Sequence, residues 1–548
     1  MLVFLRIIFI LLTLFVPFAF AGAEPWAFSI LQGGLVVIWL LYWISGPKVF
    51  LYTRLTQVAC GAALFLLILS ILQACLASNI FQPVPWHPIS MMPLYSLEFA
   101  SVFATYILAI VLVGVLFTQH KLIKLLLSLL VGVQLLVAFC AWGLPNGEYI
   151  FRLADVRGGI GPFLNRNHAA VFFAFGAILS LGLFFTSLLK KNTARYSPLS
   201  RITLSSWLWA GSFVFLTFST IMTRSRGGML ALLTGIFLYA YLHFATLKRH
   251  PIRRRRGLIW TTVALLVAIT LISTHIPQIS AFAQRSEGTS TQVRQMLYQA
   301  AAEALQQYPI WGIGTGALPV VIPAYTAYPL DQYIERLHND WLELLLSVGI
   351  VGTLPILLAI GWFILLALKR LRQLPPTKRP LFTACFTALG VMSVGSLVDF
   401  HFFIPANAFL FFICLGALTA PTYDKHQLYH LQLSRAVCII MACLCIGIIY
   451  IPTCKTMAWR NVLFSYGLRV PGKLALYRQA LSYYPSPRYA VRLGNACLNA
   501  AAQTADAPQR QALVQEANDV AIQFLRRYPK EPELSMLYLR AQNSQNSH

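Results

Sequence analysis

The chain has 548 residues, of which 58% are hydrophobic and 11% are charged, and its mean hydropathy is +0.68. This composition excludes a water-soluble globular protein and predicts a polytopic membrane protein. The net charge of +25 would suit a nucleic-acid partner, but half of the 42 Lys and Arg lie in alternate loops between apolar runs. Because that is the positive-inside pattern, we expect the basic loops to contact membrane lipids, and we expect no nucleic acid.

Thirteen apolar runs are long enough to cross a bilayer, and they must be helices because lipid cannot satisfy backbone hydrogen bonds. The first run is an alternative candidate for a cleaved signal peptide. The predicted fold class is an all-α polytopic membrane protein with about 12–13 transmembrane helices, a large periplasmic loop and a C-terminal helical domain. The runs cover residues 4–21, 28–45, 57–77, 99–118, 123–142, 169–189, 205–222, 228–246, 257–275, 344–368, 380–397, 403–420 and 436–453.

The loop charges place the amino terminus inside and the carboxyl terminus outside, so any chemistry is expected on the outer face. The tail is polar, alanine-rich and helical by pattern, and Tyr484-Pro485 and Tyr528-Pro529 each close one helical stretch. This weakly indicates tetratricopeptide-like hairpins, which bind a partner or shield a site. We divide the chain into a transmembrane scaffold (1–142), a transmembrane core (143–435) with a periplasmic loop (276–343), a last transmembrane helix (436–454) and a periplasmic helical domain (455–548).

Four consecutive hydrogen-bonding side chains, Asn165-Arg166-Asn167-His168, precede the sixth run. Guanidinium and amide groups at a membrane boundary suit an anion, so Arg166, Asn167 and His168 are candidate substrate-binding residues. The alternative is a solvated loop whose asparagines turn the chain and cap a helix.

A second polar cluster, Thr223-Arg224-Ser225-Arg226-Gly227-Gly228, joins the seventh and eighth runs with almost no loop. Arginines at the outer membrane edge need a compensating partner. The glycines let the backbone approach a ligand, and a helix N-terminus favours phosphate. Arg224 and Arg226 are therefore candidate substrate-binding residues, the alternative being arginines that snorkel to the interface.

The periplasmic loop ends in His338-Asn339-Asp340, directly before the tenth run. Because histidine titrates near neutral pH, His338 is the candidate catalytic base, with Asn339 as a candidate substrate-binding residue. The alternative is a helix start capped by Asn339 or Asp340.

Within the same loop, Gly312, Gly314 and Gly316 suit a tight re-entrant turn toward His338. One predicted helix of the loop has an apolar face made of Val293, Met296, Leu297, Ala300, Ala301, Ala304 and Leu305.

A short outer turn after the eleventh run carries Asp399 and His401. Asp399 is a candidate substrate-binding residue that orients a cation or another site residue; equally, it could cap the twelfth helix.

Eight of the ten cysteines lie within predicted runs. Cys454 and Cys497 would both face outward, and the sequence leaves open whether they pair.

Together these clusters resemble the O-antigen ligase and O-antigen polymerase superfamily, bacterial membrane glycosyltransferases that use undecaprenyl-diphosphate-linked glycans. His338-Asn339, followed by Gly349 and Gly352, is similar to the family's histidine motif. The resemblance covers residues 150–420. Further segments similar to family signatures occur in the same order, namely 165–168, 225–228 with Leu230, 309–316, 398–400 and 405–407.

The resemblance implies a multi-pass protein of the bacterial inner membrane with its active face and C-terminal domain in the periplasm. It implies that arginines hold the lipid-linked diphosphate and that the histidine activates an acceptor hydroxyl, with no cofactor. The acceptor is left open: a lipid for a ligase, a growing glycan for a polymerase, or a protein for an oligosaccharyltransferase. An envelope protein is a further possible partner through the C-terminal domain.

The residue chemistry agrees independently, because cleaving a sugar-diphosphate bond needs a base and charge stabilisation of the leaving group. We expect no metal site, the alternative being His338, Asp340 and Glu343 as ligands. Two non-enzymatic alternatives are a lipid-linked glycan transporter and an envelope-assembly scaffold. A transporter is expected to carry ionisable or helix-breaking residues near mid-span. Here the charges gather at the outer ends of the runs, which favours surface chemistry.

Overall fold

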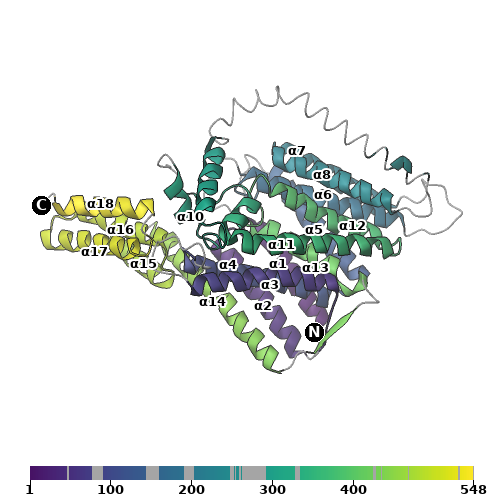
Figure 1. Ribbon diagram of the computed structural model, residues 1–548, viewed down its shortest axis with the longest axis horizontal. Coiled ribbons are helices and arrows are strands. Elements are labelled where there is room, and N and C mark those ends of the chain that lie inside the picture. The colour runs from purple at the N-terminus through teal and green to yellow at the C-terminus, as the bar shows by residue number, and fades with distance from the viewer. Residues whose placement is uncertain are drawn as a thin grey trace.

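The computed structural model describes the chain except residues 46–48, 77–89, 144–158, 190–202, 247–251, 253–254, 258, 260, 262–291, 327–333, 424–427, 433–434, 467, 469, 529–530 and 547–548. Over the described residues, the protein is an all-α polytopic membrane protein with one short pair of strands. Figure 1 shows a broad bundle of long helices, from one end of which the C-terminal helices project.

Twelve of the thirteen predicted runs coincide with helices, and the run at 257–275 lies mostly outside the described residues. Among the described helices, eight are long and apolar enough to cross a membrane, and α1, α12 and α13 are shorter apolar helices. The bundle helices are α1 (Leu2–Phe18), α2 (Pro25–Ile44), α3 (Arg54–Cys75), α4 (Pro93–Leu116), α5 (His120–Gly143), α6 (Arg166–Leu188), α7 (Leu204–Met222), α8 (Arg226–Ala245), α11 (Asp340–Gln373), α12 (Arg379–Gly395), α13 (Pro405–Thr419) and α14 (Arg435–Ser465).

Helix α6 lies at the centre of the bundle, and it is buried along most of its length. Its phenylalanines Phe172, Phe173 and Phe175 belong to one continuous core shared with α1, α2, α4, α5, α8, α12 and α13. A helix that is apolar on all sides is suited to such a central position, because no face has to meet polar solvent.

The starts of the site-bearing helices meet at one end of the bundle. Asn407 in the first turn of α13 donates from Nδ2 to the carbonyl of His168 in α6 at 3.1 Å. A Cβ on Gly228 in the first turn of α8 would lie 2.3 Å from Cβ of Ala170 in α6, so only glycine permits this approach. Sequence segments more than 200 residues apart are therefore brought together at this end.

Helix α11 is kinked at Gly349, where φ is 62°. The glycine turn after residue 308 packs into this kink: the amide N–H groups of Ile313 and Gly314 donate to the carbonyls of Leu346 and Ser347 at 2.9 and 3.0 Å. A Cβ on Gly349 would lie 2.2 Å from the Ile310 carbonyl oxygen. The predicted re-entrant turn therefore docks on α11 about two turns below His338.

The loop between α8 and α11 contains a helix at residues 292–307, then α10 (Leu318–Val321) and the 3-10 helix η4 (Ile322–Tyr325). Leu297, Ala300, Ala301 and Ala304 on the predicted apolar face are buried, whereas Val293 is exposed. This face packs in a second core that includes Phe524 and other residues of the C-terminal helices. The predicted helix is confirmed, and its apolar face is covered by protein.

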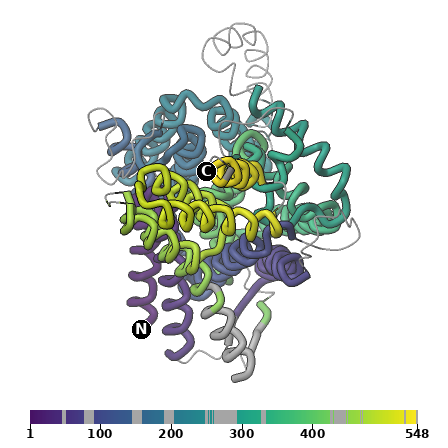
Figure 2. The backbone as a smooth tube through the Cα atoms, turned by 90° about the vertical axis from the view of Figure 1, so that its left-hand side faces the viewer, coloured from purple at the N-terminus to yellow at the C-terminus, as the bar shows by residue number. Residues whose placement is uncertain are grey.

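The C-terminal region forms four helices that pack in sequence: α15 (Val470–Tyr483), α16 (Pro487–Gln503), α17 (Ala507–Leu525) and α18 (Pro532–Asn546). Figure 2, seen from this side, shows them in front of the bundle. Helix α14 runs past the predicted end of its span to Ser465, so one continuous helix leads from the bundle into this region. Cys454 and Cys497 are both free.

Two short strands and two 3-10 helices lie between the longer helices. The strands β1 (Val49–Tyr52) and β2 (Tyr429–Gln432) pair antiparallel, with Val49 opposite Gln432. The 3-10 helices η1 (Phe20–Gly22) and η5 (Pro421–Tyr423) follow α1 and α13.

Candidate functional site

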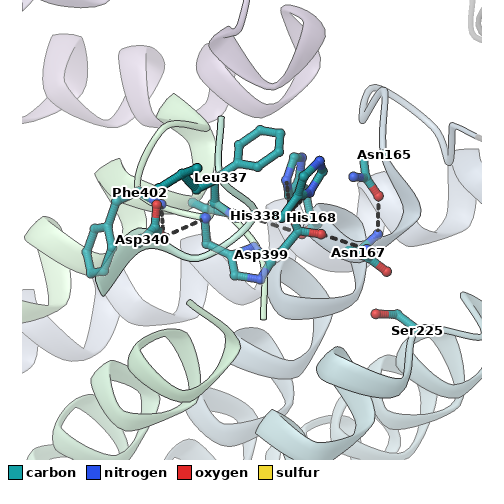
Figure 3. A network of polar contacts seen from close by, with 12 residues as sticks. Asn165, Asn167, His168, Ser225, Leu337, His338, Asp340, Asp399 and Phe402 are labelled. Atoms are coloured by element: carbon teal, nitrogen blue, oxygen red, sulfur yellow. Dashed lines mark hydrogen bonds and ion pairs between the residues drawn. The ribbon is translucent and has the colours of Figure 1, made fainter. Parts of the chain in front are cut away.

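The site is organised around the buried carboxylate of Asp399, which lies in the turn between α12 and α13. His338 Nδ1 lies 2.9 Å from Asp399 Oδ1, and Asn167 Nδ2 donates to Asp399 Oδ2 at 2.6 Å. Arg294 of the 292–307 helix lies 3.7 Å from Asp399 Oδ2. Figure 3 shows His338, His168 and Asn167 converging on this residue. Side chains from three segments far apart in sequence thus contact the carboxylate of Asp399.

The Asp399 side chain is only 1% exposed, so its charge depends on its partners. Burial alone would raise the pKa of this carboxyl, but the interactions with His168 and His338 outweigh it and hold the pKa well below its ordinary value. His168 Nε2 lies 3.6 Å from Asp399 Oδ1. Burial also lowers the pKa of the neighbouring His401 to about 3, so that imidazole is neutral. Asp399 is therefore ionised across the physiological range.

His338 presents an oriented and accessible imidazole. An ionised carboxylate only accepts hydrogen bonds, so Nδ1 carries the hydrogen toward Asp399 and Nε2 is left as the free basic nitrogen. The side chain is 31% exposed, which leaves room for a reactant. Its backbone has φ of 56°, and Tyr298 donates to its carbonyl at 3.1 Å. Positive φ in a non-glycine residue is a strained state that functional sites often retain.

The arginines of the second polar cluster stand at the start of α8. Ser225 caps this helix by accepting from the amide of Gly228 at 3.2 Å, and Arg224 and Arg226 on either side of Ser225 are exposed. Arg224 has φ of 54°, the second strained backbone at the site. A Cβ on Gly227 would lie 2.5 Å from Val398 Cγ2, so this turn packs directly beside Asp399.

The first polar cluster, residues 165–168, lies at the start of α6, and its side chains make different contacts. Asn165 caps the helix, its Oδ1 accepting from the Asn167 amide at 2.8 Å, as the structural alternative for this segment proposed. Asn167 also reaches Asp399, and His168 is buried against it. Arg166, the first helical residue, is half-buried. Figure 3 shows Ser225 near the Asn165–Asn167 end of the network, so the α6 and α8 starts lie on the same side of His338.

The start of α11 confirms the helix-cap alternative for Asn339 and gives Asp340 and Glu343 separate partners. Asn339 Oδ1 accepts from the amides of Trp341 and Leu342 at 3.1 and 3.0 Å, so Asn339 is the helix cap. Asp340 Oδ2 accepts from the amides of His401 and Phe402, whereas Glu343 pairs with Arg336 at 2.9 Å. His338, Asp340 and Glu343 thus turn to separate partners, and among the described residues no group of His, Cys, Asp or Glu is arranged to hold a metal ion.

Two residues of this site were missed in the sequence. Arg294 belongs to the predicted loop helix, which was interpreted only through its apolar face, although an arginine in a loop predicted to lie outside runs against the positive-inside bias. Arg336 pairs with Glu343, and its guanidinium carbon lies 3.6 Å from the Phe403 ring centroid. No local pattern indicated this second contact, because Phe403 is 67 residues away. The alternative of Asp399 as a helix cap is wrong, because Ile404 holds that position in α13.

A cavity of about 870 Å³ opens beside this network. It lies among α2, α3, α4, α11, α12 and α13, and most of its lining is apolar. His168, Phe400 and Arg336 line its polar end. The Phe400 ring centroid lies 4.6 Å from that of His168 and 5.0 Å from that of His338, so this ring stands between the cavity and the candidate base.

Comparison with known proteins finds a family that is similar to part of the chain. Residues 211–357 match the family described as O-antigen ligase. The matched region contains Arg226, Arg294 and His338, and Asp399 lies outside it. No curated protein matches the chain. This match over residues 211–357 supports membership of the O-antigen ligase superfamily.

Proposed function

We propose that this protein transfers a glycan from an undecaprenyl-diphosphate donor to an acceptor hydroxyl at the periplasmic face of the bacterial inner membrane. Family membership supports glycan transfer by a membrane glycosyltransferase in general. The single observation that carries the finer proposal is the Asp399–His338 pair, an oriented and accessible base beside the exposed arginines at the start of α8. Ligase, polymerase and protein oligosaccharyltransferase share this chemistry.

In the proposed reaction, His338 Nε2 takes the proton of the acceptor hydroxyl while the oxygen attacks the anomeric carbon of the donor sugar. The bond from that carbon to the diphosphate oxygen breaks, and the diphosphate leaves with the electron pair. Asp399 holds the imidazole in the required tautomer and stabilises the imidazolium that forms. With 1% exposure, Asp399 acts through His338 rather than on the substrate.

The leaving diphosphate needs positive charge in a water-poor site. Arg224 and Arg226 lie at the N-terminus of α8, where backbone N–H groups also favour an anion, and Arg166 begins the neighbouring α6. Arg294 is placed to join them because it lies against Asp399 from the loop helix. These four guanidinium groups supply the proposed diphosphate site without a metal ion.

The test is transfer by purified protein reconstituted with undecaprenyl-diphosphate glycan, with and without a divalent-metal chelator. We expect transfer in both conditions. Loss of transfer with the chelator, restored by a divalent metal, would replace the arginine proposal with a metal-dependent one. Movement of intact donor across the bilayer without transfer would favour the transporter instead.

A further inference from the structure

One turn of the loop helix at residues 292–307 contacts both members of the Asp399–His338 pair. Arg294 lies 3.7 Å from Asp399 Oδ2, and the hydroxyl of Tyr298 donates to the carbonyl of His338 at 3.1 Å. Side chains four residues apart lie on the same face of a helix, so Arg294 and Tyr298 reach the pair together. The contact at Asp399 is to the side chain, whereas the contact at His338 is to the backbone.

The loop helix is a fixed support for these two side chains. On its neighbouring face, Leu297, Ala301 and Ala304 are exposed by 2% or less. They belong to the second core, which also contains residues of the glycine turn and of the C-terminal helices. Turning the helix would expose this apolar face to water, which is unfavourable. Tyr298 therefore approaches His338 from an element that the rest of the protein holds in place.

The backbone of His338 depends on contacts from outside its own segment. Its φ of 56° lies in the left-handed region, which is unfavourable for any residue with a Cβ. A strained conformation of this kind persists only where the surrounding structure imposes it. Just before His338, the amide of Leu337 donates to Glu343 Oε2 at 3.2 Å. The Tyr298 hydroxyl then holds the carbonyl of His338 itself.

Tyr298 is suited to this contact because its hydroxyl keeps its proton. Burial raises the pKa of the hydroxyl above its ordinary value, so Tyr298 is a hydrogen-bond donor throughout the physiological range. The side chain of Asn339, which caps α11, interacts with the same hydroxyl. Tyr298 therefore links the residue that carries the candidate base to the cap of the helix that follows it.

We infer that Tyr298 is a positioning residue for His338, and that its bond to the His338 carbonyl holds the backbone in the conformation that directs Nδ1 toward Asp399. The inference rests on the proposed function. Tyr298 contacts a backbone carbonyl and no reacting atom, so it acts only through His338. Without this bond, the backbone of His338 can relax, and the imidazole loses its alignment with the carboxylate. The tautomer with the hydrogen on Nε2 then becomes populated, and that tautomer cannot accept a proton at Nε2.

The test is Tyr298→Phe in the full chain, which removes the hydroxyl and keeps the ring. The first measurement is ¹⁵N NMR of histidine-labelled protein in lipid nanodiscs at alkaline pH, with the His338 signals assigned by their loss in His338→Gln. We expect the tautomer with the hydrogen on Nδ1 in the wild-type protein and a substantial population of the other tautomer in Tyr298→Phe. An unchanged tautomer in Tyr298→Phe would overturn the inference, even if transfer fell.

The second measurement is transfer kinetics with the reconstituted protein. Tyr298→Phe should lower kcat by about threefold to tenfold, the effect of losing one hydrogen bond, and leave the donor KM unchanged. In the Asp399→Asn background, Tyr298→Phe should cause no further loss, because the carboxylate that selects the tautomer is already gone. Equal losses in both backgrounds, or an equal rise in the donor KM, would overturn the inference and make Tyr298 a residue of general stability.

Tyr308→Phe is the matched control. Tyr308 lies just past the end of the same helix, is 3% exposed, and has a hydroxyl that interacts with Tyr325. Its loss should change neither the His338 tautomer nor kcat, and changes as large as those of Tyr298→Phe would overturn the inference. Absence of transfer by the wild-type protein would instead overturn the proposed function, while the tautomer comparison would still decide whether Tyr298 positions His338.

Discussion

The two sides of His338 are built from the same kinds of helix ends, yet their charged side chains differ in pairing and exposure. On the α6 and α8 side, Arg224 and Arg226 are exposed at helix starts. On the α4 and α11 side, the cavity wall carries Glu98 and Glu343, each bound to a cation of its own. The charges on the α4 and α11 side are thus paired within the protein, whereas Arg224 and Arg226 beside α8 are exposed.

Asp399 contacts His338 directly, so its replacement should have the largest effect. Asp399→Asn keeps the volume and removes the charge that fixes the His338 tautomer. We expect transfer to fall by about two to four decades, as when the acid of a comparable triad is neutralised. Donor affinity should change little. A rate measurement under donor saturation decides this, and an activity within threefold of wild type would remove Asp399 from the mechanism.

On the arginine side, the prediction concerns the two parallel hydrogen bonds that a guanidinium group can make to a phosphate. Arg226→Lys should damage transfer nearly as much as Arg226→Ala, because a single ammonium cannot make two parallel bonds to a phosphate. We expect about a tenfold to hundredfold rise in the donor KM for both. Arg166, Arg224 and Arg294 should respond in the same direction, with smaller losses. Full activity of Arg226→Lys would contradict a bidentate role.

On the α4 and α11 side, Glu98 joins the bundle to the C-terminal helices. It pairs with Lys455 and accepts from the hydroxyl of the buried Tyr484 at 2.6 Å. Glu98→Gln retains an acceptor for Tyr484 and loses the ion pair, which is partly exposed and worth about 1 kcal/mol at most. Hydrogen exchange should show faster opening of α15 and α16 by less than tenfold. Donor affinity should be unchanged, which distinguishes the two sides of the site.

The smallest effect is expected outside both sides, in the C-terminal helices. Burial raises the pKa of Glu531 from 4.5 to about 7, and its carboxylate accepts from the Leu534 amide at 2.5 Å. A carboxyl with a raised folded-state pKa contributes stability that is complete below its unfolded pKa and is lost as pH rises through the folded pKa. Hydrogen exchange of α18 should therefore show lower stability at pH 8 than at pH 5, after correction for intrinsic exchange. Glu531→Gln should abolish that difference, and an unchanged difference in this variant would assign it to another group.

Hydrophobic length predicted the helices because a bilayer imposes the same requirement on every span. The sequence also located His338, Asn167 and Asp399, since polar clusters stand out at membrane boundaries. Their convergence was not predictable, because Asp399 meets His338 through tertiary packing across 61 residues. The sequence did not indicate Arg294 for the same reason, because Arg294 also reaches Asp399 through tertiary packing. For Asn339, the sequence could not distinguish a helix cap from a ligand-binding amide, because both roles have the same sequence pattern. The structure shows the helix cap.

The assignment of His338 as the base is the centre of this account, and one variant tests it directly. In reconstituted protein, His338→Ala should bind undecaprenyl-diphosphate glycan with wild-type affinity, because the arginines remain. Transfer to the acceptor should fall by roughly two to four decades, the usual contribution of general-base catalysis. Binding and transfer would then be separated by one side chain. Normal turnover by His338→Ala, or a parallel loss of protein abundance and donor binding, would contradict the account and leave His338 a structural residue of the α11 start.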